Sequence, residues 1–199
     1  MSVLFLATII TLAFAGSTED WKKRTIYQVL TDRFAKGNGD TSPCNDLSTY
    51  CGGDWKGLQD NLDYITGMGF DAIWISPIVA NTPGGYHGYW ASNWNEVNSN
   101  FGTSQDLKNF VDAAHKAGVW IMLDVVANHV GPVGNDFSSI VPFNSSDDYH
   151  EPQCSITSQD FATHNLNKIQ NCWLSGLPDL KQESTTVANF LTNWVKTQV

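Results

Sequence analysis

The amino-acid sequence predicts an α/β protein built from parallel β/α units, in which each strand is followed by a helix that covers the sheet. Three short, almost wholly apolar runs lie at residues 26–30, 72–75 and 120–126, and they begin about 46 to 48 residues apart. Stretches with helical spacing of apolar residues lie between them. Because the runs are continuous rather than alternating, we expect both faces of these strands to be buried.

The first run is predicted to be a strand, and a loop rich in Gly, Asn, Asp and Ser follows it at 36–53. Apolar residues then recur at helical spacing and predict one helix that ends at Gly67 or Gly69. These apolar residues are Trp55, Leu58, Leu62 and Ile65. The second strand leads into residues 76–102, which are rich in Gly and aromatic residues and are predicted to be a long loop.

The second helix is predicted to begin at a capping box formed by Thr103 and Asp106, with Asp in the place usually taken by Glu or Gln. Gly118 ends this helix, and the third strand follows. Residues 129 to about 182 are irregular and polar, which is too long for an ordinary connection, so a small inserted domain is expected there. A last helical stripe comes after the insertion, at Val187, Phe190, Leu191, Trp194 and Val195.

Composition excludes some classes of partner. The chain has 199 residues, of which 42% are hydrophobic, and a net charge of −9. Nucleic acid is not an expected partner, because no basic patch is available to neutralise phosphates, and an anionic membrane surface is disfavoured for the same reason. The eight Trp, six Tyr and ten Phe residues offer flat faces that suit either core packing or a sugar ring.

The beginning of the chain is predicted to be a secretory signal peptide, residues 1–15. Residues 3–15 are an uncharged apolar run that is short for a membrane span and ends in a small-x-small pattern at Ala13 and Ala15. The run has no Lys or Arg before it, and a buried helix or membrane anchor is the alternative. Cleavage after Ala15 predicts a secreted, extracellular protein with no membrane contact.

Four cysteines, Cys44, Cys51, Cys154 and Cys172, allow three disulfide pairings. The natural choice is local, Cys44 with Cys51 and Cys154 with Cys172, and each pair then closes one loop. A zinc site is the competing interpretation, although the sequence contains no C-x-x-C pair. Asn144 begins an N-glycosylation sequon in a polar loop.

Two segments carry candidate cation ligands. Asp124 ends the third strand, where residues of parallel β/α folds face the active site, and Asn128 and His129 follow it. An amide oxygen of Asn128 can ligate a hard cation, and the His129 imidazole can bond a ligand hydroxyl. Asp179 lies between two apolar residues and is a plausible second cation ligand. The alternative for all of these side chains is an ordinary turn in which they cap the backbone.

Residues 86–90 combine aromatic rings with a histidine and a glycine. Tyr89 and Trp90 offer faces for sugar stacking, His87 offers a hydrogen bond, and Gly88 lets the backbone pass close to a ligand. An aromatic plug that seals a loop is the alternative.

Taken together, these motifs resemble the secreted fungal-type α-amylases of glycoside hydrolase family 13. The resemblance covers about residues 20–199, and the cysteine pairs narrow it towards fungal α-amylases and the related cyclodextrin glucanotransferases. The matching segments are 26–34, 50–55, 67–75, 86–90, 101–107, 124–129, 172–174 and 177–180.

The resemblance implies a (β/α)₈ TIM barrel, of which this chain supplies the N-terminal portion, about three β/α units, with a small inserted domain B after strand three. The implied division places the first half of the catalytic barrel at 16–128, domain B at 129–182, and the third barrel helix at 183–199. The resemblance also implies a structural Ca²⁺ held by the Asn128 side chain, the Asp179 carboxylate and the main-chain oxygen of Gln170, an oxygen-only set that suits Ca²⁺. Other implied roles are sugar subsites for His87, Tyr89, Trp90 and His129, and support through hydrogen bonds for Asp124.

The family's activity is endo-hydrolysis of α-1,4-glucosidic bonds in starch and glycogen with retention of configuration, so starch and related α-glucans are the expected partners of a protein that is monomeric when complete. Retaining glycosidases need two carboxylates about 5 Å apart. In this family they follow strands four and five, and a further Asp follows strand seven, so no residue here matches them. We therefore expect a truncated α-amylase that is inactive alone. The alternatives are a cyclodextrin glucanotransferase or α-glucosidase relative, a non-catalytic starch-binding fragment, and an inert product.

Overall fold

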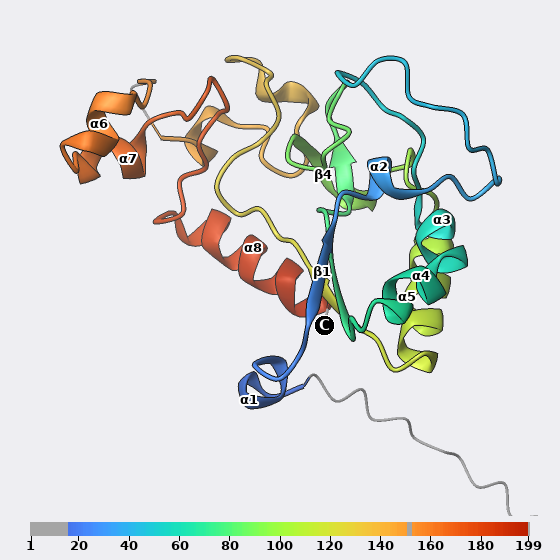
Figure 1. The fold of residues 1–199 in the computed structure, drawn as a ribbon. Helices are drawn as coiled ribbons and strands as arrows, with labels where there is room; N and C mark the ends of the chain where they lie inside the picture. Colours follow the sequence, from blue (N-terminus) through green and yellow to red (C-terminus); the bar gives the residue numbers. More distant parts are fainter. Residues whose placement is uncertain (1–15, 151–152, 199) are drawn as a thin grey trace, which may run out of the picture.

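The computed structural model describes residues 16–150 and 153–198, so the predicted signal peptide at 1–15 lies outside the described residues. Its central feature is a parallel sheet of three strands, β1 (Ile26–Val29), β2 (Ala72–Ile75) and β5 (Trp120–Leu123), in the order β1-β2-β5 (Figure 1). Ile26, Ala72 and Trp120 stand side by side in the register. The predicted parallel β/α arrangement is therefore confirmed, and within the described residues the sheet is open rather than closed into a barrel.

Burial of the strands differs from the sequence prediction. Only β2, the middle strand, is largely buried, whereas all four residues of β5 are partly exposed and Gln28 of β1 is exposed. The physical reason is that β1 and β5 are the two edges of this sheet. The third strand is also shorter than predicted, because it ends at Leu123 rather than at residue 126.

Three helices pack on one side of the sheet, and Figure 1 shows them together opposite α8 (Thr185–Thr197). They are α3 (Trp55–Asp60), α4 (Leu62–Gly67) and α5 (Ser104–Lys116). The single helix predicted after residue 55 is broken in two, because Asn61 has a non-helical backbone and its side-chain amide donates to the Gly57 carbonyl at 2.8 Å. The capping box that starts α5 is present as predicted. Two short helices, α1 (Thr18–Trp21) and α2 (Thr31–Phe34), flank β1.

The predicted loop at 76–102 contains an antiparallel hairpin, β3 (Val79–Asn81) and β4 (Ala91–Val97), so that prediction was wrong. The Asn81 side chain closes the hairpin: it accepts from the Trp90 main-chain nitrogen at 2.7 Å and donates to the Gly88 carbonyl. Two features hid the hairpin in the sequence. Its first strand, β3, has only three residues, and two of the three residue pairs across the hairpin join Ala to Asn.

The molecule has two hydrophobic cores. The first lies between the sheet and helices α3, α4 and α5, and includes Trp55, Ile73 and Phe110. The second joins the hairpin, the segment 129–182 and α8. Its buried members include Trp94, Tyr149, Leu180 and Leu191.

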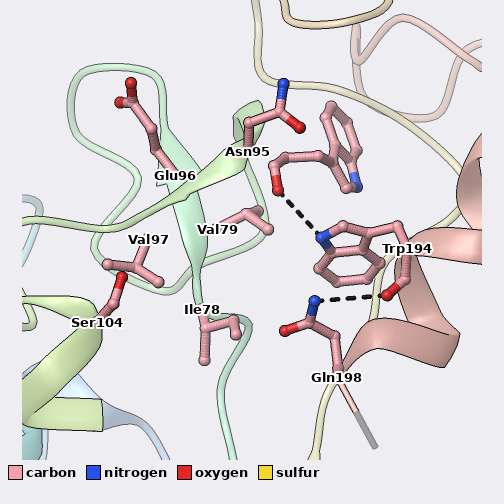
Figure 2. A pocket seen from close by; sticks show the side chains of 9 residues that line it. Ile78, Val79, Asn95, Glu96, Val97, Ser104, Trp194 and Gln198 are labelled. Atoms are coloured by element: carbon pink, nitrogen blue, oxygen red, sulfur yellow. Dashed lines mark hydrogen bonds between the residues drawn. The ribbon is translucent and has the colours of Figure 1, made fainter. Parts of the chain in front are cut away.

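The predicted helical stripe at the end of the chain is present as α8, with Val187 and Leu191 buried. Figure 2 shows how Trp194 fixes this helix to the hairpin, because its indole nitrogen donates to the Trp94 carbonyl at 3.0 Å. A pocket of about 120 Å³ lies beside this contact, and among the described residues that line it Glu96 is the only ionisable one. The described lining of this pocket therefore does not supply the pair of carboxylates that a retaining glycosidase needs.

In its described residues, 129–150 and 153–182, the segment after β5 has short helical turns as its regular elements. They are η1 (Phe137–Ser139), η2 (Ser146–Asp148), α6 (Ser158–Ala162) and α7 (Leu166–Asn171). Asn144 is exposed, as a glycosylation acceptor must be. Within residues 16–150 and 153–198, no helix has the length and apolar character needed to cross a membrane.

Both local disulfides are present, Cys44–Cys51 and Cys154–Cys172. They are separated by 7 and 18 residues in the sequence, respectively. On the chain-entropy model the longer loop contributes about 0.8 kcal/mol more than the shorter one.

We expect Cys154→Ser/Cys172→Ser to lower the free energy of unfolding by about 2–4 kcal/mol, and Cys44→Ser/Cys51→Ser to lower it by slightly less. Urea unfolding of both double variants under non-reducing conditions measures this difference. A larger loss for the shorter loop would contradict the entropic explanation.

Candidate functional site

A pocket of about 230 Å³ opens at the carboxyl ends of β1, β2 and β5. Its lining comes from all three strand ends and from the 86–90 segment, and consists of Gln28, Val29, Leu30, Trp74, Ser76, Tyr89 and Asp124. The carboxyl ends of parallel strands are where β/α folds place their functional residues. This pocket is therefore the candidate site.

Asp124 is held in one orientation at the end of β5. Its main-chain nitrogen donates to the Ile75 carbonyl at 3.1 Å, which extends the pairing with β2 by one residue. One carboxylate oxygen, Oδ2, accepts both the Tyr89 hydroxyl at 2.7 Å and the Trp74 indole nitrogen at 3.2 Å. Burial, followed by the hydrogen bond to Asp124, raises the pKa of Tyr89 to about 12, so this hydroxyl keeps its proton and remains a donor.

The rings of the 86–90 segment pack on one another. The ring centroids of His87 and Tyr89 lie 5.7 Å apart in a stacked arrangement, and His87 meets Trp90 edge-on at 4.9 Å. The Tyr89 main-chain nitrogen donates to His87 Nδ1 at 3.0 Å, so Nδ1 is the unprotonated nitrogen of that ring. Gly88 has a φ of +87°, and a Cβ there would lie 2.7 Å from the Pro77 carbonyl oxygen. Glycine is thus required at residue 88 because the backbone there passes close to Pro77, rather than because it passes close to a ligand.

His129 links the end of β5 to this aromatic segment. Its Nε2 lies 3.0 Å from the Tyr89 carbonyl oxygen, which makes Nε2 the protonated nitrogen. Burial lowers the pKa of His129. Burial also lowers the pKa of His87, and the positive charge of Arg33 lowers it further. The structure thus links His87, Tyr89, Trp90, His129 and Asp124 in one group: His87 packs on Tyr89 and Trp90, His129 contacts the Tyr89 carbonyl, and the Tyr89 hydroxyl bonds Asp124.

Asn128 and Asp179 meet at the junction between β5 and the segment that follows it. The Asn128 side-chain nitrogen lies 3.1 Å from Asp179 Oδ1. Two main-chain hydrogen bonds hold the two segments together beside this contact. Leu180 donates to the Asn128 carbonyl at 2.8 Å, and Val130 donates to the Pro178 carbonyl at 3.1 Å. Asp179 is only 4% exposed, and burial raises the pKa of its carboxyl group.

This pair has the donor chemistry of a hard-cation site. A carboxylate and an amide oxygen are ligands that Ca²⁺ accepts, and rotating the Asn128 amide by half a turn exchanges its nitrogen for its oxygen. Gln170, whose main-chain oxygen is the third predicted ligand, lies in α7 and is exposed. The described residues also contain no cluster of three His, Cys, Asp or Glu side chains that could hold a metal. A cation here would therefore need amide and main-chain oxygens in addition to the Asp179 carboxylate.

Sequence reasoning missed three residues of this region. Trp74 supports Asp124, Arg33 lies with its guanidinium carbon 3.9 Å from the Tyr86 ring centre, and His150 bonds Asp179 Oδ2 at 2.6 Å. Each acts through a contact between distant parts of the chain. Their spacing in the sequence carried no signal.

The open parallel sheet, with its pocket at the carboxyl ends of the strands, defines part of a β/α-barrel type of domain. A family profile described as the alpha-amylase catalytic domain matches residues 28–197, and the chain belongs to that family. The resemblance predicted from the sequence motifs is thereby confirmed.

Individual relatives agree with this assignment. Alpha-amylase 3 of Schizosaccharomyces pombe is 44% identical over 99% of this chain and 37% of its own length. The structure of an alpha-amylase from Malbranchea cinnamomea superposes with a TM-score of 0.83 at 42% identity, over 91% of this chain and 40% of that one. An alpha-amylase from Geobacillus thermoleovorans, complexed with acarbose, gives 0.78 at 39% identity, over 89% and 38%. The chain spans about two fifths of the length of these relatives.

The lowered pKa of His87 predicts a pH-dependent stability. Because the folded chain holds this imidazole neutral while the unfolded chain protonates it near pH 6.5, the unfolded state binds more protons as the pH falls below that value. Stability from this site is thus present above pH 6.5 and is lost at lower pH. Between about pH 7.5 and about pH 5.5, we expect the wild-type chain to lose more unfolding free energy than His87→Gln in urea titrations. Equal losses would contradict a half-buried, neutral His87.

Proposed function

We propose that this chain is part of a secreted α-amylase that hydrolyses α-1,4-glucosidic bonds of starch and glycogen internally, with retention of configuration. The observation that carries the proposal is that Tyr89 and Asp124 line one pocket at the strand ends and bond each other, in a member of the alpha-amylase family. His87 stacks on the Tyr89 ring, His129 contacts the Tyr89 carbonyl, and Trp90 packs edge-on against His87. The Geobacillus relative is complexed with acarbose, which supports an α-glucan as the ligand.

In this proposal, His87, Tyr89, Trp90 and His129 form the sugar-binding wall. The Tyr89 and Trp90 rings supply apolar faces against which a glucose ring packs. The two imidazoles remain neutral at pH 7, so they add no charge to the wall. The backbone contact of His87 uses Nδ1, which leaves Nε2 to bond a sugar hydroxyl. Asp124, already held through Oδ2, presents its Oδ1 atom to the substrate and supports the site without reacting.

The wall supplies binding but not the bond-breaking pair. Retention of configuration requires a nucleophile and a general acid about 5 Å apart, and Asp124 is the only carboxylate among the residues that line the pocket. This same observation favours a second candidate function, a starch-binding module without hydrolytic activity. Binding and hydrolysis assays on the chain are therefore both needed.

We also propose a structural Ca²⁺ at Asn128 and Asp179, with the main-chain oxygen of Gln170 as the third ligand. The bound ion would supply positive charge beside a buried carboxylate and tie the two ends of the segment 129–182 together. The proximity of Asn128 Nδ2 and Asp179 Oδ1, 3.1 Å apart, supports the first two ligands.

The proposed organisation keeps 16–128 and 183–199 as barrel elements and 129–182 as domain B. The two disulfides and the exposed Asn144 support an extracellular location, because disulfides persist in oxidising compartments. We propose that the complete protein is a monomer and acts on starch.

We expect the 199-residue chain to bind acarbose without releasing reducing sugar from starch. Tryptophan fluorescence measures binding, and Trp90→Leu should weaken it about tenfold because the stacking face is lost. Trp21→Leu is the matched control, since Trp21 packs against Trp120 at the start of β5, away from the pocket. Turnover above a blank that disappears in a variant of this chain would show that the active carboxylates lie within it. Binding unaffected by Trp90→Leu would refute the sugar-binding wall.

We expect Asp179→Ala to weaken Ca²⁺ binding more than Asn128→Ala does, because a carboxylate contributes charge to hard-cation binding and an amide contributes only a dipole. Isothermal titration calorimetry with CaCl₂ on the two variants and the wild-type chain measures the difference. Unchanged affinity in Asp179→Ala would refute the assignment of this ligand.

A further inference from the structure

His150 is a buried residue for which neither the sugar-binding wall nor the cation ligands give a role. It is 6% exposed and lies two residues after the η2 turn, before the Cys154–Cys172 loop. Its ring nitrogens both have carboxylate partners: Nδ1 lies 2.6 Å from Asp179 Oδ2, and Nε2 lies 2.8 Å from Glu183 Oε2. With a partner at each nitrogen, the ring is fixed against rotation.

The backbone places this ring beside Asp179 as firmly as the side chains do. The His150 main-chain nitrogen donates to the Asp179 carbonyl at 3.1 Å, and the preceding residue, Tyr149, forms an antiparallel bridge with Leu180. Lys181 donates to the Asp148 carbonyl at 2.8 Å. The two strand-like segments therefore run side by side, and the contact between His150 and Asp179 is built into their register.

The consequence for Asp179 is that its two oxygens face different neighbours. Oδ2 is occupied by His150, whereas Oδ1 faces Asn128. A carboxylate rotates easily about its terminal torsion unless such contacts hold it. Hydrogen bonds to ligating carboxylates commonly set the orientation in which they meet a metal.

Glu183 extends this arrangement to the next helix. It stands one residue before Ser184, the N-cap of α8, and its side chain is 59% exposed. Its carboxylate therefore approaches the buried imidazole from the solvent side. Through His150, the start of α8 is connected to Asp179.

We propose that His150 is a positioning residue for the cation site: it holds the Asp179 carboxylate with Oδ1 directed to Asn128, and Glu183 holds His150 in turn. This inference rests on the proposed Ca²⁺ site at Asn128 and Asp179. It assigns no ligand role to His150 itself, because both of its nitrogens are already engaged by carboxylates.

Two matched pairs of variants test the proposal in the full 199-residue chain, with CaCl₂ titration calorimetry as the readout. His150→Asn keeps a nitrogen near the position of Nδ1, towards Asp179, whereas His150→Gln keeps one near the position of Nε2, towards Glu183. We expect His150→Gln to weaken Ca²⁺ binding about 10- to 100-fold and His150→Asn to remain within about threefold of wild type. Both variants lose the imidazole, so a difference between them isolates the contact with Asp179.

The second pair changes Glu183, whose exposed side chain leaves the core intact. Glu183→Gln keeps an oxygen acceptor for Nε2, and Glu183→Ala removes it. Both remove the negative charge, so that charge effects on Ca²⁺ cancel in the comparison. We expect Glu183→Ala to bind Ca²⁺ about three- to tenfold more weakly than Glu183→Gln.

Urea unfolding in the presence of a chelator separates positioning from general stability. Equal Ca²⁺ affinities for His150→Gln and His150→Asn would overturn the proposal, as would tighter binding by His150→Gln. Should His150→Gln fail to fold, equal affinities in the Glu183 pair would overturn it instead. A wild-type chain that binds no Ca²⁺ would refute the cation site itself, which is a different result from wild-type binding that His150 does not affect.

Discussion

The segment 129–182 leaves the sheet after β5 and returns to the end of that strand. The rest of the site depends on the contacts that close this segment. Asn128 and Asp179 are 51 residues apart in the sequence, yet their side chains lie within hydrogen-bond distance. Three main-chain bonds hold the junction: from Val130 to Pro178, from Leu180 to Asn128, and from His150 to Asp179. Because a loop of this length is costly to close by chain entropy alone, the buried core around Tyr149 and Leu180 must offset that cost.

The junction also fixes one side of the sugar-binding wall. His129 directly follows Asn128 of the proposed cation site, and its imidazole donates to the Tyr89 carbonyl in the aromatic segment. On the other side, the guanidinium of Arg33 stacks on Tyr86 and donates to the carbonyls of Leu47 and Thr49. The aromatic segment is therefore held on one side by the disulfide-closed loop that follows β1, and on the other side by His129, which follows β5. No single loop determines the geometry of the wall.

Sequence reasoning succeeded where local patterns determine structure. The apolar runs located all three parallel strands, and the capping box at Thr103 located the start of α5. It failed where a side chain overrides the local pattern, as at Asn61, whose amide splits the predicted helix, and at Asn81, which closes a hairpin inside the predicted loop.

The candidate site shows the same division. The proximity of the 86–90 segment, His129 and Asp124 was predictable because these residues are contiguous or follow a strand end. Trp74, Arg33 and His150 were not, since each contributes through a partner between 29 and 53 residues away: Asp124, Tyr86 and Asp179, respectively. Contacts at that range follow from the register of the fold, which a single sequence does not display. The exposure of β1 and β5 was missed for a related reason, because burial depends on the neighbours of a strand and not on its own residues.

The chemistry of the pocket separates binding from bond cleavage. A general acid must carry a proton at the working pH, and a nucleophile must present a free, charged oxygen at the reacting carbon. The imidazoles of His87 and His129 have lowered pKa values and are hydrogen-bonded to the backbone, so neither is suited to act as the general acid. The Tyr89 hydroxyl, with its pKa raised to about 12, is bound to Asp124. What remains is one carboxylate, buttressed by Trp74 and Tyr89, at the base of a wall of rings. Such an arrangement supplies contact surface and hydrogen-bonding groups, whereas a second carboxylate for bond cleavage is not among the described residues that line the pocket.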